Sequence, residues 1–122
     1  MYYTKHVTLT DTTETTMFAI PNGYTCYVTF VFAANHGGST NSVDVKWTDN
    51  EPVPNDLMYI FDGTTINSGN NTTLGGQSDA PIFVLHAGEV VKAQATSAGN
   101  IEVAITFKLV EQSPSLINFN GS

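Results

Sequence analysis

Histidine and cysteine are the side chains that most often carry catalysis or bind metals, and this 122-residue sequence has few of them. His6, His36 and His86 are widely separated and show neither the His-x-His nor the HExxH spacing of metal sites. We expect them to be solvent-facing imidazoles. Cys26, the single cysteine, alternates with apolar neighbours, which predicts an inward-pointing thiol that behaves as a small, inert hydrophobic side chain. One thiol also makes no internal disulfide.

The acidic segment over residues 49–56 is the best candidate for an ion site. It carries Asp49, Glu51 and Asp56, and hard cations such as Ca²⁺ take several carboxylate and carbonyl oxygens. Its spacing fits no calcium-loop template, and Pro52 and Pro54 restrict the convergence of the carboxylates. We therefore interpret it as a solvated or partner-facing loop. Because GxSxG, P-loop and dinucleotide-binding patterns are also missing, the sequence predicts a protein that is not an enzyme and has no cofactor or metal.

Aromatic side chains could instead stack on sugar rings, as on the exposed sheet faces of carbohydrate-binding modules. Trp47 alternates with valines, so we expect it in the core. Sugar binding therefore remains an alternative interpretation. The aromatic candidates are Tyr2, Tyr3, Tyr24, Tyr27, Tyr59 and Trp47.

Composition excludes several classes of partner. The chain has four lysines, no arginine and eleven carboxylates, which give a net charge of −7. Such a chain neutralises neither the phosphates of a nucleic acid nor an anionic bilayer, so we expect no nucleic-acid or membrane partner. No apolar run approaches the length of a spanning helix, and the start lacks a signal-peptide pattern, so we expect a soluble, unprocessed protein. The length fits one domain with its own core.

Apolar residues at every second position are the dominant pattern, and they predict strands with one wet face. The pattern is strongest from Ile101 to Leu109. The expected strands cover residues 3–10, 16–20, 24–34, 43–48, 57–61, 81–86, 89–96 and 101–109. About eight strands predict an all-β fold, a single antiparallel β-sandwich for which jelly-roll wiring is one option. A small closed barrel is the structural alternative.

Two segments refine this picture. Both faces of the strand over residues 24–34 are apolar, with Cys26, Phe30 and Phe32 expected on one side and Tyr27 and Val31 on the other, so we expect a central, doubly covered strand. The polar segment over residues 67–77 is expected to be an edge or a long surface loop. Glycine-marked reversals are expected at residues 21–23, 36–38, 62–63, 75–76, 87–88 and 99–100.

The alternation stops after Val110, which predicts a β-sandwich domain over residues 1–110 and a C-terminal tail over residues 111–122. The tail carries Leu116, Ile117 and Phe119, three large apolar residues that need a cover. They either fold back on their own sandwich or lie on a neighbouring subunit as an arm.

Three segments resemble small virion proteins of tailed bacteriophages. The run from Thr15 to Thr25 is similar to their opening pattern T-x-x-Y-x-V-P-x-G-x-T. Residues 81–95 look like their hairpin P-x-x-L-x-A-G-D-x-(L/V)-x-(A/V)-x-A, and residues 100–106 look like the closing strand N-x-(D/E)-V-x-(V/I/L)-x. Together these segments extend the resemblance over about residues 4–110. They are turn and strand patterns, and the acidic segment and the tail depart from them.

The resemblance implies a non-enzymatic β-sandwich built into a phage particle. We expect a capsid decoration (cement) protein on the outer capsid surface, which binds the major capsid protein and forms a homo-oligomer, a dimer or trimer. A tail, neck or fibre component is the alternative within the particle. The absence of arginine fits a position outside a DNA-filled shell. The candidate partner contacts are Tyr2, Tyr3, Leu116, Ile117, Phe119, Asp49, Glu51 and Asp56.

Overall fold

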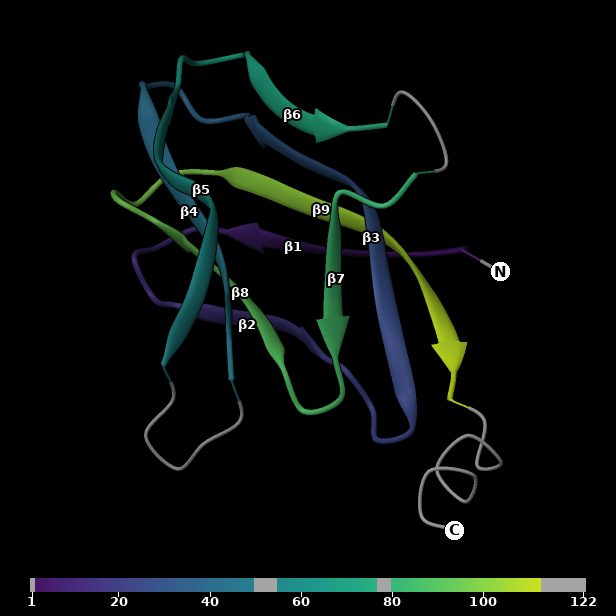
Figure 1. Ribbon diagram of the computed structural model, residues 1–122. Coiled ribbons are helices and arrows are strands. Elements are labelled where there is room, and N and C mark those ends of the chain that lie inside the picture. Colours follow the sequence, from purple (N-terminus) through teal and green to yellow (C-terminus); the bar gives the residue numbers. More distant parts are fainter. Residues whose placement is uncertain (1, 50–54, 77–79, 113–122) are drawn as a thin grey trace, which may run out of the picture.

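The computed structural model describes residues 2–49, 55–76 and 80–112, and within β5 the side chains of residues 56 and 57 are not described (Figure 1). This part of the chain forms nine strands. Their bounds are β1 Tyr2–Leu9, β2 Thr15–Ala19, β3 Tyr24–Asn35, β4 Asn41–Thr48, β5 Asp56–Ile66, β6 Asn71–Gly75, β7 Phe83–His86, β8 Val90–Ala95 and β9 Ile101–Glu111. The described residues contain no helix long and apolar enough to cross a membrane.

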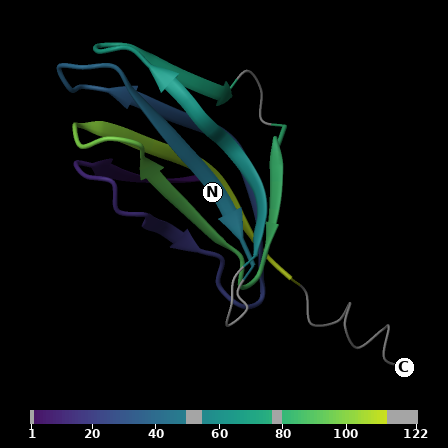
Figure 2. The same cartoon turned by 90° about the vertical axis from the view of Figure 1, so that its left-hand side faces the viewer.

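The strands form two sheets that pack face to face, so the predicted β-sandwich is confirmed (Figure 2). One sheet has the order β1-β9-β3-β6, with β7 also paired to β3, and the other has the order β2-β8-β4-β5. The antiparallel pairs are nested: β4 pairs with β5, β3 with β6, β2 with β8, and β1 with β9. Successive pairs lie in alternate sheets. This is the wiring of a jelly roll, with β7 added in the connection between β6 and β8.

The core lies between the sheets and consists of inward-facing residues of both. β9 places Ile101, Val103, Ile105 and Phe107 there at every second position, each 3% exposed or less. β4 supplies buried valines from the other sheet in the same way. Burying each such side chain stabilises the fold by roughly 1.5–3 kcal/mol, which is why alternation along the sequence predicted strands such as β9.

The structure decides one alternative left open by the sequence and corrects one expected reversal. Residues 71–75 form β6, a short edge strand paired to the second half of β3, within the segment for which an edge or a loop was expected. The reversal expected at Asp62-Gly63 is wrong, because β5 continues to Ile66. Gly63 has a φ of +59° and its N–H donates to the Asp44 carboxylate, so it marks an irregularity in the β4–β5 pairing.

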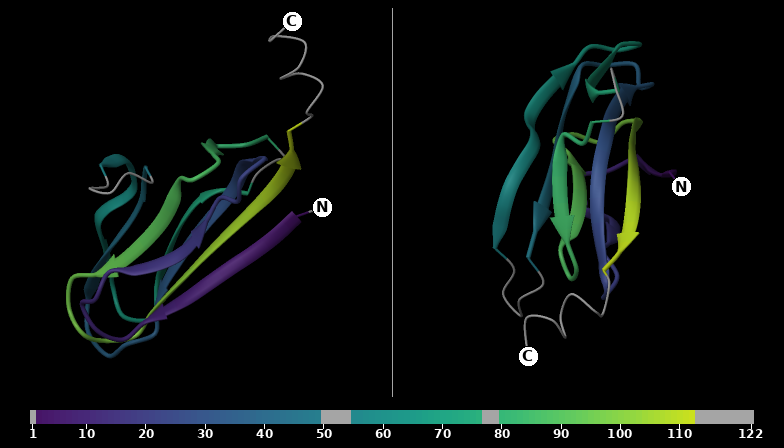
Figure 3. Two further views of the ribbon diagram at one scale, coloured as in Figure 1. Left: turned by 90° about the horizontal axis from the view of Figure 1, so that it is seen from below. Right: turned by 45° about the vertical axis from the view of Figure 1, so that its right-hand side comes forward.

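A β-bulge at Thr29 corrects the predicted faces of β3. Val28 is opposite Phe107, whereas Phe30 is opposite Thr106, so Thr29 is the extra residue. After the bulge Val31 points into the core, and Phe30 moves to the outer side of the sheet. Phe32 lies on the same outer side, away from Cys26. β3 is central in its sheet, with β9 on one edge and both β6 and β7 on the other (Figure 3, right).

Candidate binding surface

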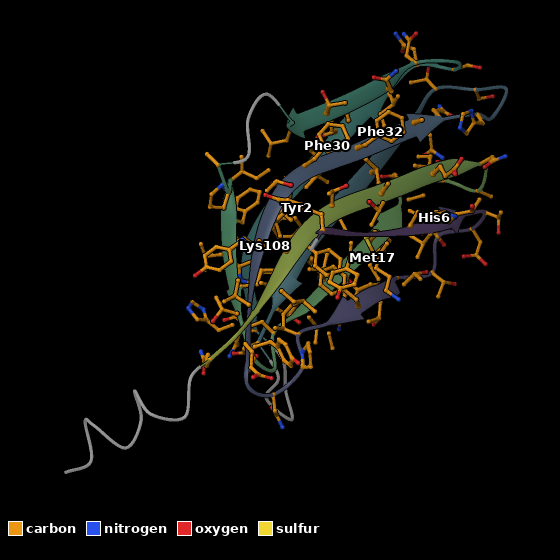
Figure 4. All side chains as sticks on the ribbon, turned by 90° about the vertical axis from the view of Figure 1, so that its right-hand side faces the viewer. Tyr2, His6, Met17, Phe30, Phe32 and Lys108 are labelled. Carbon is orange, nitrogen blue, oxygen red and sulfur yellow. The ribbon has the colours of Figure 1, made fainter. Side chains whose placement is uncertain are left out.

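The outer side of the five-stranded sheet carries several large apolar side chains. Residues that are directly paired across antiparallel strands lie on the same side of a sheet, so the register defines rows. One row runs Tyr2, Lys108, Tyr27 and Val84 across β1, β9, β3 and β7. Neighbouring rows add Phe30, Phe32 and Val110. We call Tyr2, Tyr27, Phe30, Phe32, Val84 and Val110 the outer aromatic face; Figure 4 labels Tyr2, Phe30, Phe32 and the nearby Lys108 on it.

Several members of this face are strongly exposed. Tyr2 is 47% exposed, Val84 40% and Val110 38%. Tyr27, Phe30 and Phe32 are half-buried. Phe30 and Phe32 stack along β3 with their ring centroids 6.4 Å apart. The sheet thus presents apolar area to solvent where an alternating strand ordinarily presents polar residues.

A hollow of about 240 Å³ lies within the outer aromatic face. It is lined by Tyr2, Tyr27, Thr29, Pro81, Lys108 and Val110. The bulge at Thr29 contributes to its shape, because a bulge bends the strand locally. Thr29 is itself only 7% exposed, and its hydroxyl donates to the Thr106 carbonyl at 3.4 Å. The lining is therefore mostly apolar, with the Lys108 ammonium as its one charged group.

The outer side of the four-stranded sheet is different, because it carries neutralised charges. Lys46 of β4 and Lys92 of β8 are directly opposite each other, a pairing that is repulsive by itself. Glu14 lies 3.0 Å from Lys46 Nζ and 3.6 Å from Lys92 Nζ, so one carboxylate serves both ammonium groups. Lys46 Nζ also lies 5.7 Å from the centre of the Tyr59 ring. This side is a polar, internally paired surface.

The structure places the predicted partner contacts Tyr2, Tyr3 and Asp49 on different parts of the molecule. Tyr2 lies in the hollow. Tyr3 points to the opposite side of β1, where its ring is 5.8 Å from that of Phe107, which stacks on Phe18 at 4.4 Å. Asp49 accepts hydrogen bonds from the Asn55 backbone N–H at 2.9 Å and the Asn55 amide at 3.3 Å, so its carboxylate helps to hold the base of its own loop.

The remaining predicted contacts are not tested by the structure. Glu51, Leu116, Ile117 and Phe119 lie outside the described residues, and Asp56 lies in β5 with its side chain undescribed.

The other candidate residues are dispersed over the molecule. His36 lies 3.2 Å from Glu102, just after the end of β3, and His86 lies 3.8 Å from Glu89, opposite Thr25 at the start of β3. Trp47 packs against the core, as expected, and meets Phe83 edge-on with their ring centroids 5.3 Å apart. In the parts of the chain that the structure covers, no three residues of the types His, Cys, Asp and Glu group to hold a metal ion.

Cys26 is fully buried, as the alternation predicted. Burial disfavours the thiolate and raises the pKa of its thiol from 9.0 to about 12. The thiol is therefore protonated and unreactive in the folded protein at neutral pH.

Sequence reasoning missed most of the outer aromatic face. It named Tyr2 as a contact and Tyr27 among the aromatic candidates, but it placed Phe30 and Phe32 on the side of Cys26. The useful signal was the apolar character of both sides of residues 24–34. A strand that is apolar on both sides needs two covers, and the described structure supplies a sheet on one side only.

Neither a family model nor a curated protein matches this sequence, so no family supports the resemblance to tailed-phage proteins. Solved structures do share the fold. A chain from Bacillus endospore appendages, which form disulfide-linked pili, is 11% identical with a TM-score of 0.55, over 93% of this chain and 88% of that one. A chain from the acidic stable capsid of Helicobacter pylori bacteriophage KHP30 is 14% identical with a TM-score of 0.50, over 92% and 93%. At these identities the likeness shows a common fold.

Proposed function

We propose that this protein is a structural component of a phage virion, and specifically a decoration protein that binds the major capsid protein on the outer surface of the head. The outer aromatic face is the observation that carries the proposal. A large exposed apolar patch on a soluble domain typically marks an interaction surface. Tyrosine and phenylalanine are also enriched in the cores of protein–protein interfaces.

The fold is compatible with this role, since a phage capsid chain shares it over nearly its full length. The charge of −7 and the lack of arginine support a position outside the shell, away from packaged nucleic acid. The proposal assigns the chain no catalytic role and no cofactor. It also includes self-association into a dimer or trimer, which would cover part of the apolar surface.

The likeness to a pilus chain supports a different kind of assembly less well. Those appendages are disulfide-linked, whereas Cys26 is the only cysteine in this sequence and is fully buried. A covalent link between copies through Cys26 would require the sandwich to open. We therefore propose a non-covalent assembly.

Quantitative mass spectrometry of purified virions tests the proposal through copy number. A decoration protein should be present in tens to hundreds of copies per particle. It should be recovered with the head fraction when heads and tails are separated. A handful of copies recovered with the tail or neck would overturn the head assignment. Absence from particles would overturn the virion role.

A matched pair of variants tests whether the outer aromatic face makes the contact. Phe32→Ser removes an aromatic ring from that face, and Met58→Ser removes a 43% exposed apolar side chain from β5 in the other sheet. The full-length variants are added to particles that lack the protein. We expect at least tenfold weaker binding for Phe32→Ser and unchanged binding for Met58→Ser, with circular dichroism confirming that both fold.

A second candidate function, carbohydrate binding, is favoured by Tyr2 and Tyr27 in the lining of the hollow. Their rings could stack on the apolar face of a sugar. A glycan array, followed by titration of Tyr27→Ala, tests it. Binding that is lost in Tyr27→Ala would support an adhesion role, and an array without binders would remove it.

A further inference from the structure

We infer that the hollow on the outer aromatic face receives residues 116–119 of a second copy of this chain. The inference deepens the proposed assembly role and rests on it, because it names the occupant of part of the same surface. The occupant is a segment outside the described residues that carries Leu116, Ile117 and Phe119.

β9 brings the start of this segment to the hollow. Lys108 and Val110 of β9 line the hollow, and β9 ends at Glu111. Gln112 continues the strand direction, because its N–H donates to the Gly23 carbonyl at 2.7 Å and its side-chain amide to Thr25 Oγ1 at 3.1 Å. The chain is therefore held extended up to the turn that joins β2 and β3.

The direction of β9 favours a neighbouring molecule over the chain's own hollow. The seven residues from 113 to 119 can span about 23 Å when extended. Ser113 precedes Pro114, and a residue before proline disfavours the helical conformation and prefers an extended one. Gln112, the last described residue of this segment, is bonded to Gly23 in the turn between β2 and β3, so the described chain has already passed the hollow beside Val110.

The chemistry of the segment matches that of the hollow. The described residues that line the hollow are mostly apolar and include no carboxylate, and residues 113–122 contain no charged side chain. Two copies that each carry a charge of −7 repel each other, and this repulsion is smallest where an uncharged segment meets a surface without acidic groups.

Such an arm-to-hollow contact joins two different surfaces. It therefore closes a dimer by reciprocal exchange or a trimer as a ring. Each closed form satisfies one arm and one hollow per subunit.

Cysteine cross-linking of the full chain tests the inference. Val110→Cys places a thiol in the hollow and Ile117→Cys places one in the arm, while the buried Cys26 stays in both variants. The two single variants are mixed under mild oxidation. We expect a covalent dimer that combines one copy of each variant. Met58→Cys is the matched control, since it places an exposed thiol on β5, and its mixture with Ile117→Cys should give none.

The double variant Val110→Cys/Ile117→Cys, studied at low protein concentration, shows whether the hollow is filled by residues 116–119 of the same chain or of a second copy. An intramolecular disulfide would show that the arm returns to its own hollow and would overturn the inference. Absence of any 110–117 cross-link in assembled particles would also overturn it, because another partner then fills the hollow, and the virion role would stand. A specific cross-link in a protein that is absent from virions would leave the arm contact intact and overturn the proposed function.

Sedimentation velocity gives an independent readout. We expect Leu116→Ser/Phe119→Ser to lower the oligomer fraction at least fivefold, and Asn118→Ser to leave it unchanged. Equal oligomer fractions for both variants would contradict the arm contact.

Discussion

Two buried asparagines hold the loops at one end of the sandwich. Asn35 is 1% exposed; its amide donates to the Ser39 carbonyl at 2.8 Å and the Ile66 carbonyl at 2.9 Å, and its Oδ1 accepts from the Gly37 N–H at 2.9 Å. Asn41 binds the backbone N–H and carbonyl of Ser97 in a similar way. These amides replace backbone partners that the loops themselves lack.

We predict that Asn35→Ala lowers the free energy of unfolding by about 3 kcal/mol, because it leaves buried backbone groups without partners. Urea denaturation measures the loss. Asn100→Ala is the control, since its side chain is exposed, and it should change stability by less than about 0.5 kcal/mol. Similar losses in the two variants would show that the Asn35 network contributes little.

Cys26 gives a second prediction at this scale. Its thiol should resist iodoacetamide at pH 8 in the folded protein and react fully in denaturant. The unfolded thiol ionises above pH 9.0, whereas the folded thiol stays protonated up to about pH 12. Its contribution to stability is therefore complete below pH 9.0 and declines as the pH rises from there toward about 12. Cys26→Ala should lack this component of the decline. Rapid labelling under native conditions would contradict the burial.

These residues also show what the sequence can predict. The inward position of Cys26 follows from its apolar neighbours at alternate positions. The role of Asn35 does not, because asparagine before Gly37-Gly38 is equally typical of an exposed turn. Burial of an amide depends on loops that meet only in the folded chain.

At the scale of the elements, two glycines with positive φ lie where strand pairing is irregular or ends, Gly63 in β5 and Gly75 in β6. Gly75 ends β6 with a φ of +80°, and a Cβ there would lie 2.4 Å from the Thr29 carbonyl oxygen. Gly63 in β5 also has a positive φ, +59°, but a Cβ there would have nothing within 4 Å. Alanine substitutions at the two positions therefore distinguish the free-energy cost of backbone strain, present at both, from that of steric overlap, present only at Gly75.

We predict that Gly63→Ala costs about 1 kcal/mol from the left-handed conformation alone. Gly75→Ala should cost at least about 1 kcal/mol more, because the Cβ also displaces the β6 end from the Thr29 bulge. Denaturation compares the two variants, and hydrogen exchange should show faster exchange of the β6 amides in Gly75→Ala only. Equal losses would mean that β6 shifts freely.

The elements were predictable to the extent that their alternation was unbroken. β9 and the first half of β3 follow the sequence pattern. The bulge at Thr29 adds one residue, so the side chains of β3 after it point to the opposite side of the sheet from the one that alternation predicts. No residue type in the sequence predicts this bulge. Gly63 illustrates the same limit, since a positive φ serves a reversal or a bulge equally well.

At the scale of the molecule, charge opposes association and the outer aromatic face favours it. The calculated pI is about 4.5, so the net charge of −7 at pH 7 approaches zero near that pH. We predict that self-association increases as the pH falls from 7 toward 4.5 and that high salt at pH 7 has a similar, weaker effect. Sedimentation velocity across this range measures it. Phe32→Ser should reduce the increase, and an unchanged monomer at pH 4.5 would contradict the prediction.

The nested pairing of the strands has a consequence for synthesis. Of the nine described strands β1 is synthesised first, yet its sheet neighbour β9, which spans residues 101–111, is synthesised after the other eight. At about 5–20 residues per second, a ribosome takes roughly 5–20 s to add residues 10–100, which lie between them. During this time Val7 and Leu9 have no sheet partner. The nascent chain therefore completes its sandwich only after β9 has left the exit tunnel.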